Sequence, residues 1–214
     1  MDLYLLRHGE TDWNRAGLLQ GHTDISLNEN GRRQISETAQ KLCALKVEMN
    51  LILSSPLRRA YESAEIAAEK LGYPPEDIIV EPMLIERGFG AGEGMTLTER
   101  NTRFPDHAYP GMESQTDLVR RAGRAFEKIV TDCSGAENVL LVAHGAVLFA
   151  VLEAVSKERI VAAGKAAALT QGSIYRIRYT DGRIGFAKYN EEKAAFLEAD
   201  TELIARSVKI YLET

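Results

Sequence analysis

The stretch LYLLRHGETDWN at positions 3–14 begins as a short apolar run and turns polar abruptly at Arg7 and His8. Such a run has the length and composition of a buried β-strand. A second apolar run, in ENVLLVAHG at positions 137–145, ends in the same way with His144. Open α/β sheets bind their ligands just beyond the carboxyl ends of their strands. We therefore expect the two histidines to converge on one crevice if the two strands are neighbours.

Strand and helix patterns alternate along the rest of the chain. Further strands are expected in LILSS (51–55), in DIIVEP (77–82) and in a hairpin at 173–190, and helices at 31–46, 54–73, 113–132, 146–156 and about 191–212. Alternating strands and helices are typical of a mainly parallel sheet that is covered on both faces. The chain is thus predicted to form one domain over residues 1–214, with a three-layer α/β/α architecture.

The helix at 54–73 has the clearest local signals. Ser55 is expected to cap its N-terminus, Pro56 to occupy the first helical position, and Gly72 to end it. Apolar residues repeat within it at intervals of three to four, the period of a helix with one buried face. Arg59 then falls in the first turn, where free backbone N–H groups favour an anion.

The composition limits the partners that the chain can bind. Its 214 residues are 45% hydrophobic and 27% charged, with a formal net charge of −5 and no block of lysine or arginine. Nucleic acids and anionic membranes are therefore not expected as partners. No stretch approaches the roughly 18 apolar residues of a membrane span, and the N-terminus does not resemble a secretory signal. Cys43 and Cys133 are the only cysteines, which favours a reducing, cytoplasmic location.

The polar residues near the two histidines suit a phosphoryl group. Arg7, Arg59, the two imidazoles and the amide of Asn14 would hold its oxygens without a metal ion. Glu86, in MLIERGFG (83–90), adds a carboxyl group that can give and take a proton. Taken singly, each of these residues is more often structural or solvent-exposed. Together at one sheet edge, they indicate a site for a phosphate ester.

Six stretches of the chain resemble the histidine phosphatase superfamily, also called the phosphoglycerate-mutase-like family. They are LLRHGETDWN (5–14), QGHTDISLNENGRRQ (20–34), SSPLRRAYESA (54–64), LIERGFGAGEG (84–94), GMESQTDLVRR (111–121) and VLLVAHGAV (139–147). The resemblance runs from Leu3 to about Leu152 and implies a phosphoglycerate-mutase-like fold.

The resemblance also implies roles for individual residues. The catalytic residues would be Arg7, His8, Arg59, Glu86 and His144, and the substrate-binding residues Arg7, Asn14, Gln20, Gly21, Arg59 and His144. Neutral His8 would attack phosphorus and form a phosphohistidine, while Glu86 would protonate the leaving oxygen and then activate water. Arg59, rather than Arg58, takes the place of the phosphate-binding arginine. The implied activity is hydrolysis of a phosphomonoester of a small metabolite.

Two other functions remain open. The first is cofactor-dependent phosphoglycerate mutase. The mutases that the chain resembles carry a long insertion after the Glu86 segment, whereas only 26 residues separate Glu86 from Glu113 here. Phe89 and Leu97 stand where those mutases have a tyrosine and a lysine, which favours a phosphatase. The second alternative is a non-catalytic phosphate-binding module, which the complete set of catalytic residues disfavours.

A metal centre is a further alternative. His8, His144 and Glu86 could act as ligands, but they lack the short spacings of zinc sites. Arg7 and Arg59 beside them would also repel a cation. We therefore expect neither a metal ion nor a cofactor.

The loop at 95–112 shows no pattern that specifies a substrate. His22 and His107 lie in loops that could overhang the crevice, and both are interpreted as surface histidines. The substrate and the oligomeric state are not indicated by any pattern.

Overall fold

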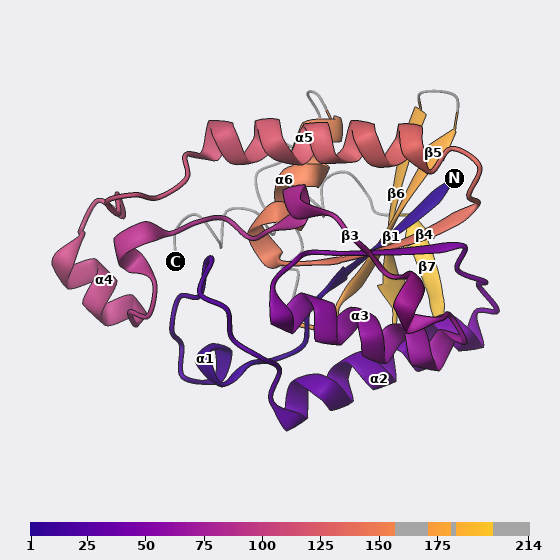
Figure 1. The fold of residues 1–214 in the computed structure, drawn as a ribbon, viewed down its shortest axis with the longest axis horizontal. Helices are drawn as coiled ribbons and strands as arrows, with labels where there is room; N and C mark the ends of the chain where they lie inside the picture. The colour runs from indigo at the N-terminus through magenta and orange to yellow at the C-terminus, as the bar shows by residue number, and fades with distance from the viewer. Residues whose placement is uncertain (157–170, 181–182, 199–214) are drawn as a thin grey trace.

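The computed structural model describes residues 1–156, 171–180 and 183–198, which fold around a seven-stranded sheet (Figure 1). The strands are β1 (Asp2–Arg7), β2 (Leu51–Ser54), β3 (Ile79–Val80), β4 (Asn138–Ala143), β5 (Ile174–Thr180), β6 (Arg183–Asn190) and β7 (Ala195–Glu198), and their order in the sheet is β3-β2-β4-β1-β5-β6-β7. The first four of this order pair in parallel, and the last three continue from β1 in antiparallel pairs. The predicted α/β fold and the hairpin at 173–190 are confirmed, although β3 is shorter than the strand expected at 77–82.

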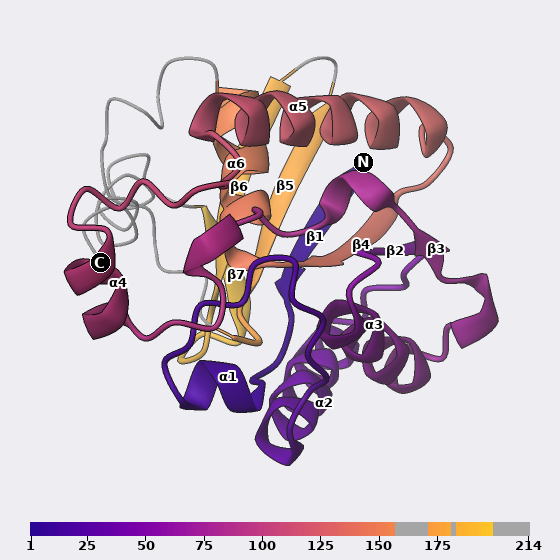
Figure 2. The same cartoon turned by 60° about the vertical axis from the view of Figure 1, so that its left-hand side comes forward.

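Helices cover both faces of the sheet. The described helices are α1 (Asp12–Arg15), α2 (Glu29–Ala44), α3 (Arg58–Leu71), α4 (Leu97–Arg103), α5 (Gln115–Asp132) and α6 (Gly145–Ser156), with short 3-10 turns at Pro75–Asp77, Pro82–Leu84 and Gly90–Gly92. Figures 1 and 2 show α5 and α6 on one side of the strands and α2 and α3 on the other, which confirms the three layers. Among the described helices, none is long and apolar enough to cross a membrane.

The alternating directions of the β1 side chains explain why the sheet has a hydrophobic core on each of its two faces. Leu3 and Leu5 pack with α5 and α6, whereas Tyr4 and Leu6 pack with α2 and α3. Successive side chains of a strand point to opposite faces of the sheet. Both faces are covered by helices here, so the strand reads in sequence as a continuous apolar run.

The start of α3 corrects the prediction for this helix. α3 begins after Leu57, its N-cap, which makes no side-chain cap hydrogen bond. Ser55 is therefore not the cap, and Pro56 does not occupy the first helical position. The Ser55 hydroxyl lies instead 2.7 Å from the ring of His144. Gly72 ends the helix with a left-handed φ of 70°, as predicted.

The prediction of a helix at 191–212 is wrong for the part of this range that the structure describes. Ala195–Glu198 form β7, which pairs with β6. Phe196 explains the difference, because its ring packs edge-on against the rings of Tyr4 and Tyr189, at centroid distances of 5.5 and 5.6 Å. These partners are distant in sequence or on another strand, so no local pattern could indicate them. The rest of the predicted helix lies outside the described residues.

The pairing of β1 with β4 positions the two histidines. The strands run parallel, and their register pairs Arg7 with Ala143 at the carboxyl ends. His8 and His144 are the next residues along the chain, and the backbone N–H of His8 donates to the carbonyl of Ala143 at 2.9 Å. The centroids of the two imidazole rings lie 5.1 Å apart. The expected convergence of the histidines at one sheet edge is therefore confirmed.

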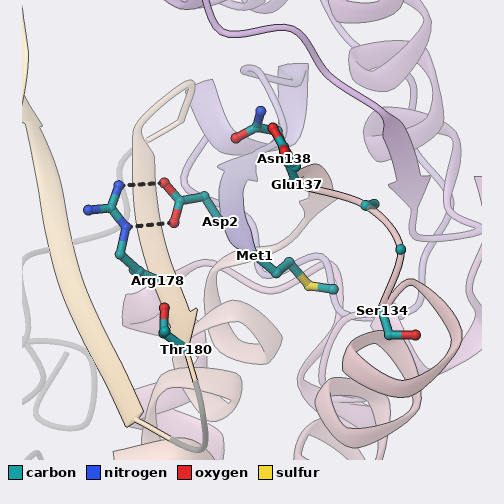
Figure 3. A pocket seen from close by; sticks show the side chains of 9 residues that line it. Met1, Asp2, Ser134, Glu137, Asn138, Arg178 and Thr180 are labelled. Atoms are coloured by element: carbon teal, nitrogen blue, oxygen red, sulfur yellow. Dashed lines mark hydrogen bonds and ion pairs between the residues drawn. The ribbon is translucent and has the colours of Figure 1, made fainter.

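The amino ends of β1 and β4 border a different cavity, of about 440 Å³ (Figure 3). Asp2 and Arg178 line it and pair with each other through two contacts of 2.8 Å. None of the predicted site residues lines this cavity, so it is distinct from the candidate site at the opposite edge of the sheet.

Candidate active site

A cavity of about 290 Å³ lies at the carboxyl ends of β1 and β4, where the two histidines converge. The predicted site residues in its lining are Arg7, His8, Asn14, Gln20, Gly21, Arg59 and Glu86. His144 is not in the lining but is fully buried beside His8. The structure therefore brings all the predicted site residues together, although they come from distant parts of the chain.

The ring of His8 is held in one tautomer. Its Nδ1 lies 2.7 Å from the carbonyl oxygen of Gly9. A carbonyl oxygen only accepts hydrogen bonds, so Nδ1 carries the proton and donates it, and Nε2 is unprotonated. Burial, followed by the positive charges of Arg7 and Arg59, lowers the pKa of His8 well below its ordinary value of 6.5. His8 is therefore neutral near pH 7, with a lone pair on Nε2.

Gly9 permits the close packing of the loop that carries His8. A Cβ atom at Gly9 would collide with the backbone of Gly31 in the first turn of α2. The backbone N–H of Gly9 donates to the hydroxyl of Ser63, on α3, at 3.2 Å. The glycine after this histidine is thus required by the approach of two backbones, and the loop is fixed against both helices.

His144 is held through the other ring nitrogen. Its Nε2 lies 2.7 Å from the hydroxyl oxygen of Ser55, which accepts a 3.3 Å hydrogen bond from the backbone N–H of the α3 N-cap residue. Ser55 can direct its own proton to Nε2, which leaves the proton of a neutral ring on Nδ1. Nδ1 is buried and has no hydrogen-bond partner among the described residues. Burial first, and then neighbouring positive charge with Arg59 foremost, lowers the pKa of His144 well below 6.5.

Arg59 is fixed by two carbonyl groups. Its Nη1 and Nη2 donate to the backbone oxygens of Thr23 and Gly21, at 2.9 and 2.7 Å. Its Nε is buried and has no hydrogen-bond partner in the described part of the chain. Burial lowers the pKa of the Arg59 guanidinium, and the charge of Glu86 is the strongest opposing influence. Arg58 is exposed, so Arg59 is the arginine that the helix register directs into the cavity.

Arg7 is buried at the end of β1 and packs against the start of α6. Its guanidinium carbon would lie 3.3 Å from a Cβ atom at Gly145. The glycine after His144 therefore makes room for a side chain, whereas the glycine after His8 makes room for a backbone.

Thr11, which is not among the residues predicted from the sequence, orients two amide side chains of the cavity. Its hydroxyl oxygen lies 3.0 Å from both Asn14 Oδ1 and Gln20 Oε1, and it is fully buried. With their oxygens turned to Thr11, the two amides keep NH₂ groups that can donate to phosphoryl oxygens. The capping box that Thr11 and Asn14 form at α1 is the signal that could have identified this residue.

The carboxylate of Glu86 lies at the N-terminus of α6. Its Oε1 accepts from the backbone N–H groups of Arg87 and Val147, at 2.9 and 3.1 Å, and its Oε2 from that of Ala146 at 3.3 Å. The N-terminus of a helix favours a negative charge. His22 is exposed, as expected, but its Nε2 donates to the backbone oxygen of Glu86 at 2.8 Å and supports this residue from outside the cavity lining.

Glu93 joins two loops of the cavity wall and was also missed. Its carboxylate accepts hydrogen bonds of 2.7–3.0 Å from the backbone N–H groups of His22, Thr23 and Phe89 and from the Thr23 hydroxyl. Burial by itself would raise the pKa of Glu93, but these hydrogen bonds outweigh it and lower the pKa. A Cβ atom at Gly21 would collide with this carboxylate. No local signal could identify a residue whose partners Thr23 and His22 lie about 70 positions away.

The donor set suits an anion better than a metal ion. Within the described ranges, no group of three or more His, Cys, Asp and Glu side chains could hold a metal. The buried guanidinium groups of Arg7 and Arg59 beside the histidines repel cations and attract anions. The arrangement can therefore bind a phosphoryl group next to the unprotonated Nε2 of His8.

Comparisons with known proteins agree with this chemistry. The chain is 42% identical to the uncharacterized phosphatase PhoE of Bacillus subtilis over 152 residues, which cover 71% of this chain and 76% of that protein. The solved structure of Bacillus stearothermophilus YhfR is 30% identical and matches with a TM-score of 0.72, covering 86% of this chain and 93% of that one. A mycobacterial glucosyl-3-phosphoglycerate phosphatase, solved in complex with VO3, is 28% identical with a TM-score of 0.69, over 83% of this chain and 92% of that one.

The family profile agrees as well. The profile of the histidine phosphatase superfamily (branch 1) matches residues 3–192, which include both His-Gly pairs and every predicted site residue. The chain belongs to the histidine phosphatase superfamily.

Proposed function

We propose that this protein hydrolyses a phosphomonoester of a small metabolite through a phosphohistidine on His8. The observation that carries the proposal is the tautomer of His8, whose Nδ1 donates to Gly9 and whose unprotonated Nε2 belongs to a cavity lined by Arg7 and Arg59. A histidine that only bound phosphate would present an N–H donor to it, because a lone pair repels phosphoryl oxygens. A lone pair in an anion site suits a nucleophile.

In the first step, Nε2 of His8 attacks phosphorus, and the bond between phosphorus and the ester oxygen breaks. The leaving oxygen receives a proton from Glu86 and departs as an alcohol. Arg7, Arg59 and the Nδ1–H of His144 donate to the other phosphoryl oxygens and stabilise their charge in the transition state.

In the second step, water attacks the phosphohistidine and the bond between nitrogen and phosphorus breaks. Glu86, now a carboxylate, takes a proton from the water, and orthophosphate leaves. The lone pair on His8 is regenerated. Backbone N–H groups of Arg87, Ala146 and Val147 hold the carboxyl group of Glu86 in position for both steps.

Hydrolysis is proposed over transfer to a second hydroxyl, the mutase reaction. Leu97 is exposed and lies outside the cavity lining, and Phe89 lines the cavity with a ring that offers no hydrogen bond. These two positions therefore give no donor to a phosphoglycerate carboxylate. The names of the compared Bacillus subtilis and mycobacterial proteins, both phosphatases, also support hydrolysis.

Metal independence and a cytoplasmic location are further parts of the proposal. The charge of Arg7 and Arg59 supplies the electrostatic stabilisation that a metal ion would otherwise give, and activity should survive treatment with EDTA. Cys43 and Cys133 are not joined in a disulfide, which is consistent with a reducing compartment.

Trapping the phosphorylated protein tests the proposal. After brief reaction with a labelled aryl phosphate, the label should be stable in base and lost in acid, as a phosphorus–nitrogen bond is. The His144→Ala variant should still acquire label, more slowly, while His8→Ala should acquire none. An acid-stable label, a base-labile label, or a labelled His8→Ala protein would each contradict His8 as the nucleophile.

A further inference from the structure

The active-site cavity contains a third arginine, Arg100, for which the proposed hydrolysis has no use. It lies on α4, in the part of the chain where the sequence showed no substrate pattern. Its Nε is buried without a hydrogen-bond partner in the described ranges, and none of the ion pairs found there includes it. A guanidinium that lines a cavity with one buried, unpaired donor is suited to receive an anionic ligand.

Tyr109 holds this guanidinium in place. Arg100 Nη1 donates to the phenol oxygen of Tyr109 at 3.3 Å, and the Nδ1 of His107 lies 3.1 Å from the same oxygen. The Tyr109 ring is itself buried, packs edge-on against Phe104 at 5.5 Å and leaves no space for a Cβ atom at Gly92. Arg100 is thus anchored through one nitrogen to a rigid support.

The anchor leaves one edge of the guanidinium for a ligand. With Nη1 bonded to Tyr109, Nε and Nη2 of Arg100 remain as two parallel donors. This pair of donors matches the two oxygens of a carboxylate or of a phosphate. A neutral substrate group would leave the charge of Arg100 uncompensated.

Arg100 reaches the cavity from a different side than the arginines next to the nucleophile. Arg7 and Arg59 come from the end of β1 and the first turn of α3, whereas the segment before α4 makes backbone hydrogen bonds of 2.8 and 3.1 Å with Leu19. Figure 1 shows α4 at the outer end of the molecule, away from the sheet. A phosphoryl group bound at His8 therefore leaves Arg100 to another part of the substrate.

We propose that Arg100 is a specificity-determining residue that binds a second anionic group of the substrate. The substrate class is then a small phosphomonoester that carries a carboxylate or a second phosphate at its far end. This inference rests on the proposed function, because it assumes that the first phosphate is bound and transferred at His8.

Matched synthetic substrates test the inference. Propane-1,3-diol monophosphate ends in a hydroxyl, 3-phosphonooxypropanoate ends in a carboxylate, and propane-1,3-diol bisphosphate ends in a second phosphate. The same three end groups on chains of four to six carbons vary the distance between the phosphate transferred at His8 and the group bound by Arg100. We expect wild-type kcat/KM to be higher for an anionic end than for the hydroxyl at the best chain length, and the carboxylate and phosphate series show which anion is preferred.

The variant Arg100→Met should lower this preference about ten- to a hundredfold, the worth of a hydrogen bond between charged groups. The loss should appear mainly in KM, because the far anion is bound equally in the ground and transition states. Tyr109→Phe, which removes only the anchoring hydroxyl, should lower the preference by a smaller factor. Arg103→Met is the matched control, since Arg103 is on the same helix, stacks on Phe104 and lies outside the cavity lining, and it should keep the wild-type preference.

Two outcomes would overturn the inference: a wild-type protein without preference for an anionic end, or an equal change in Arg100→Met and Arg103→Met. Neither outcome would affect the proposed function. That is tested separately by nitrophenyl phosphate hydrolysis, which should depend on His8 whatever the far-end preference.

Discussion

β1 and β4 end in the same dipeptide, His-Gly, at neighbouring positions of one sheet edge, yet the two histidines are held in opposite ways. His8 donates from Nδ1 to the carbonyl of Gly9 and keeps a lone pair on Nε2. His144 contacts Ser55 through Nε2 and keeps its other nitrogen, Nδ1, unpaired among the described residues. The neighbouring hydrogen-bond partner therefore decides which histidine can attack phosphorus and which can donate to its oxygens.

The surroundings of the two rings are otherwise similar, which makes the difference informative. Both are buried, and burial and the nearby arginines lower the pKa of each below 6.5. Neither charge nor exposure distinguishes them. The comparison teaches that the same residue pair in the same local context can serve two roles when one hydrogen-bond partner is a carbonyl and the other a hydroxyl.

Alanine at each histidine gives the largest expected effects. His8→Ala should lower kcat for nitrophenyl phosphate by about 10⁴-fold or more, because the nucleophile is lost. His144→Ala should lower it by about 10²–10³-fold, because one donor to the transition state is lost. Steady-state kinetics with circular dichroism as a check on folding measures both. Equal losses in the two variants would break the distinction between the histidines.

The next largest effect is expected for the substitution of Glu86, whose carboxyl group lies at the N-terminus of α6, the helix after His144. Glu86→Gln should slow phosphorylation by an alkyl phosphate about 10²–10⁴-fold, because an alcohol of high pKa cannot leave without a proton. Nitrophenolate leaves without one, so its phosphorylation step should slow much less. Rapid-mixing measurements of the nitrophenol burst separate this step from hydrolysis of the phosphohistidine. The same proportional loss with both substrates would exclude Glu86 as the proton donor.

Arg59 acts on both histidines, because its positive charge lowers the pKa of each. Arg59→Ala should reduce kcat/KM about 10²-fold or more through the loss of a charged donor to the phosphoryl oxygens. Arg58→Ala is the matched control, and its activity should stay close to wild type because Arg58 is exposed outside the cavity. Similar losses in the two variants would mean that the helix register assigned to the cavity is incorrect.

The smallest expected effect is on the free energy of unfolding, and it arises from the lowered pKa that the two histidines share. Their pKa values are lowered in the folded protein and ordinary, near 6.5, in the unfolded chain, so below this pH the unfolded chain binds protons that the folded protein does not. The free energy of unfolding should therefore fall as the pH drops below about 6.5, by up to about 1.4 kcal/mol per pH unit for each histidine, and these two groups should contribute no slope well above it. Urea denaturation of wild type and His144→Asn from pH 5 to 8 measures the slope. A variant as steep as wild type would contradict a neutral, buried His144.

Much of the fold could be predicted because its signals are local. The apolar runs of β1 and β4, the periodicity of α3 and the glycine at its end each depend on a few neighbouring residues. Where the prediction was wrong, a distant partner overrode the local signal. Ser55 is not the N-cap of α3, and its hydroxyl is paired with His144 instead. Phe196 lies on a strand, where its ring packs against that of Tyr4.

The residues of the candidate site also differ in whether a local sequence pattern reveals them. Arg7, His8 and His144 could be placed by the ends of two apolar runs. Thr11 could be found only indirectly, through the capping box that it forms with Asn14. Glu93 could not be found at all, because its partners His22 and Thr23 lie about 70 positions away in the chain.

The class of fold, the sheet edge at which the site lies and the residue types gathered there follow from local sequence patterns, because strand length, helix period and turn residues are properties of short segments. Which nitrogen of each histidine is free, and that Arg100 lines the cavity without a counter-ion among the described residues, could be learned only from the three-dimensional arrangement. The physical reason is that a hydrogen bond or an unpaired charge depends on atoms that folding brings together from distant positions, and Gly9, Ser55 and Tyr109 supply those atoms here.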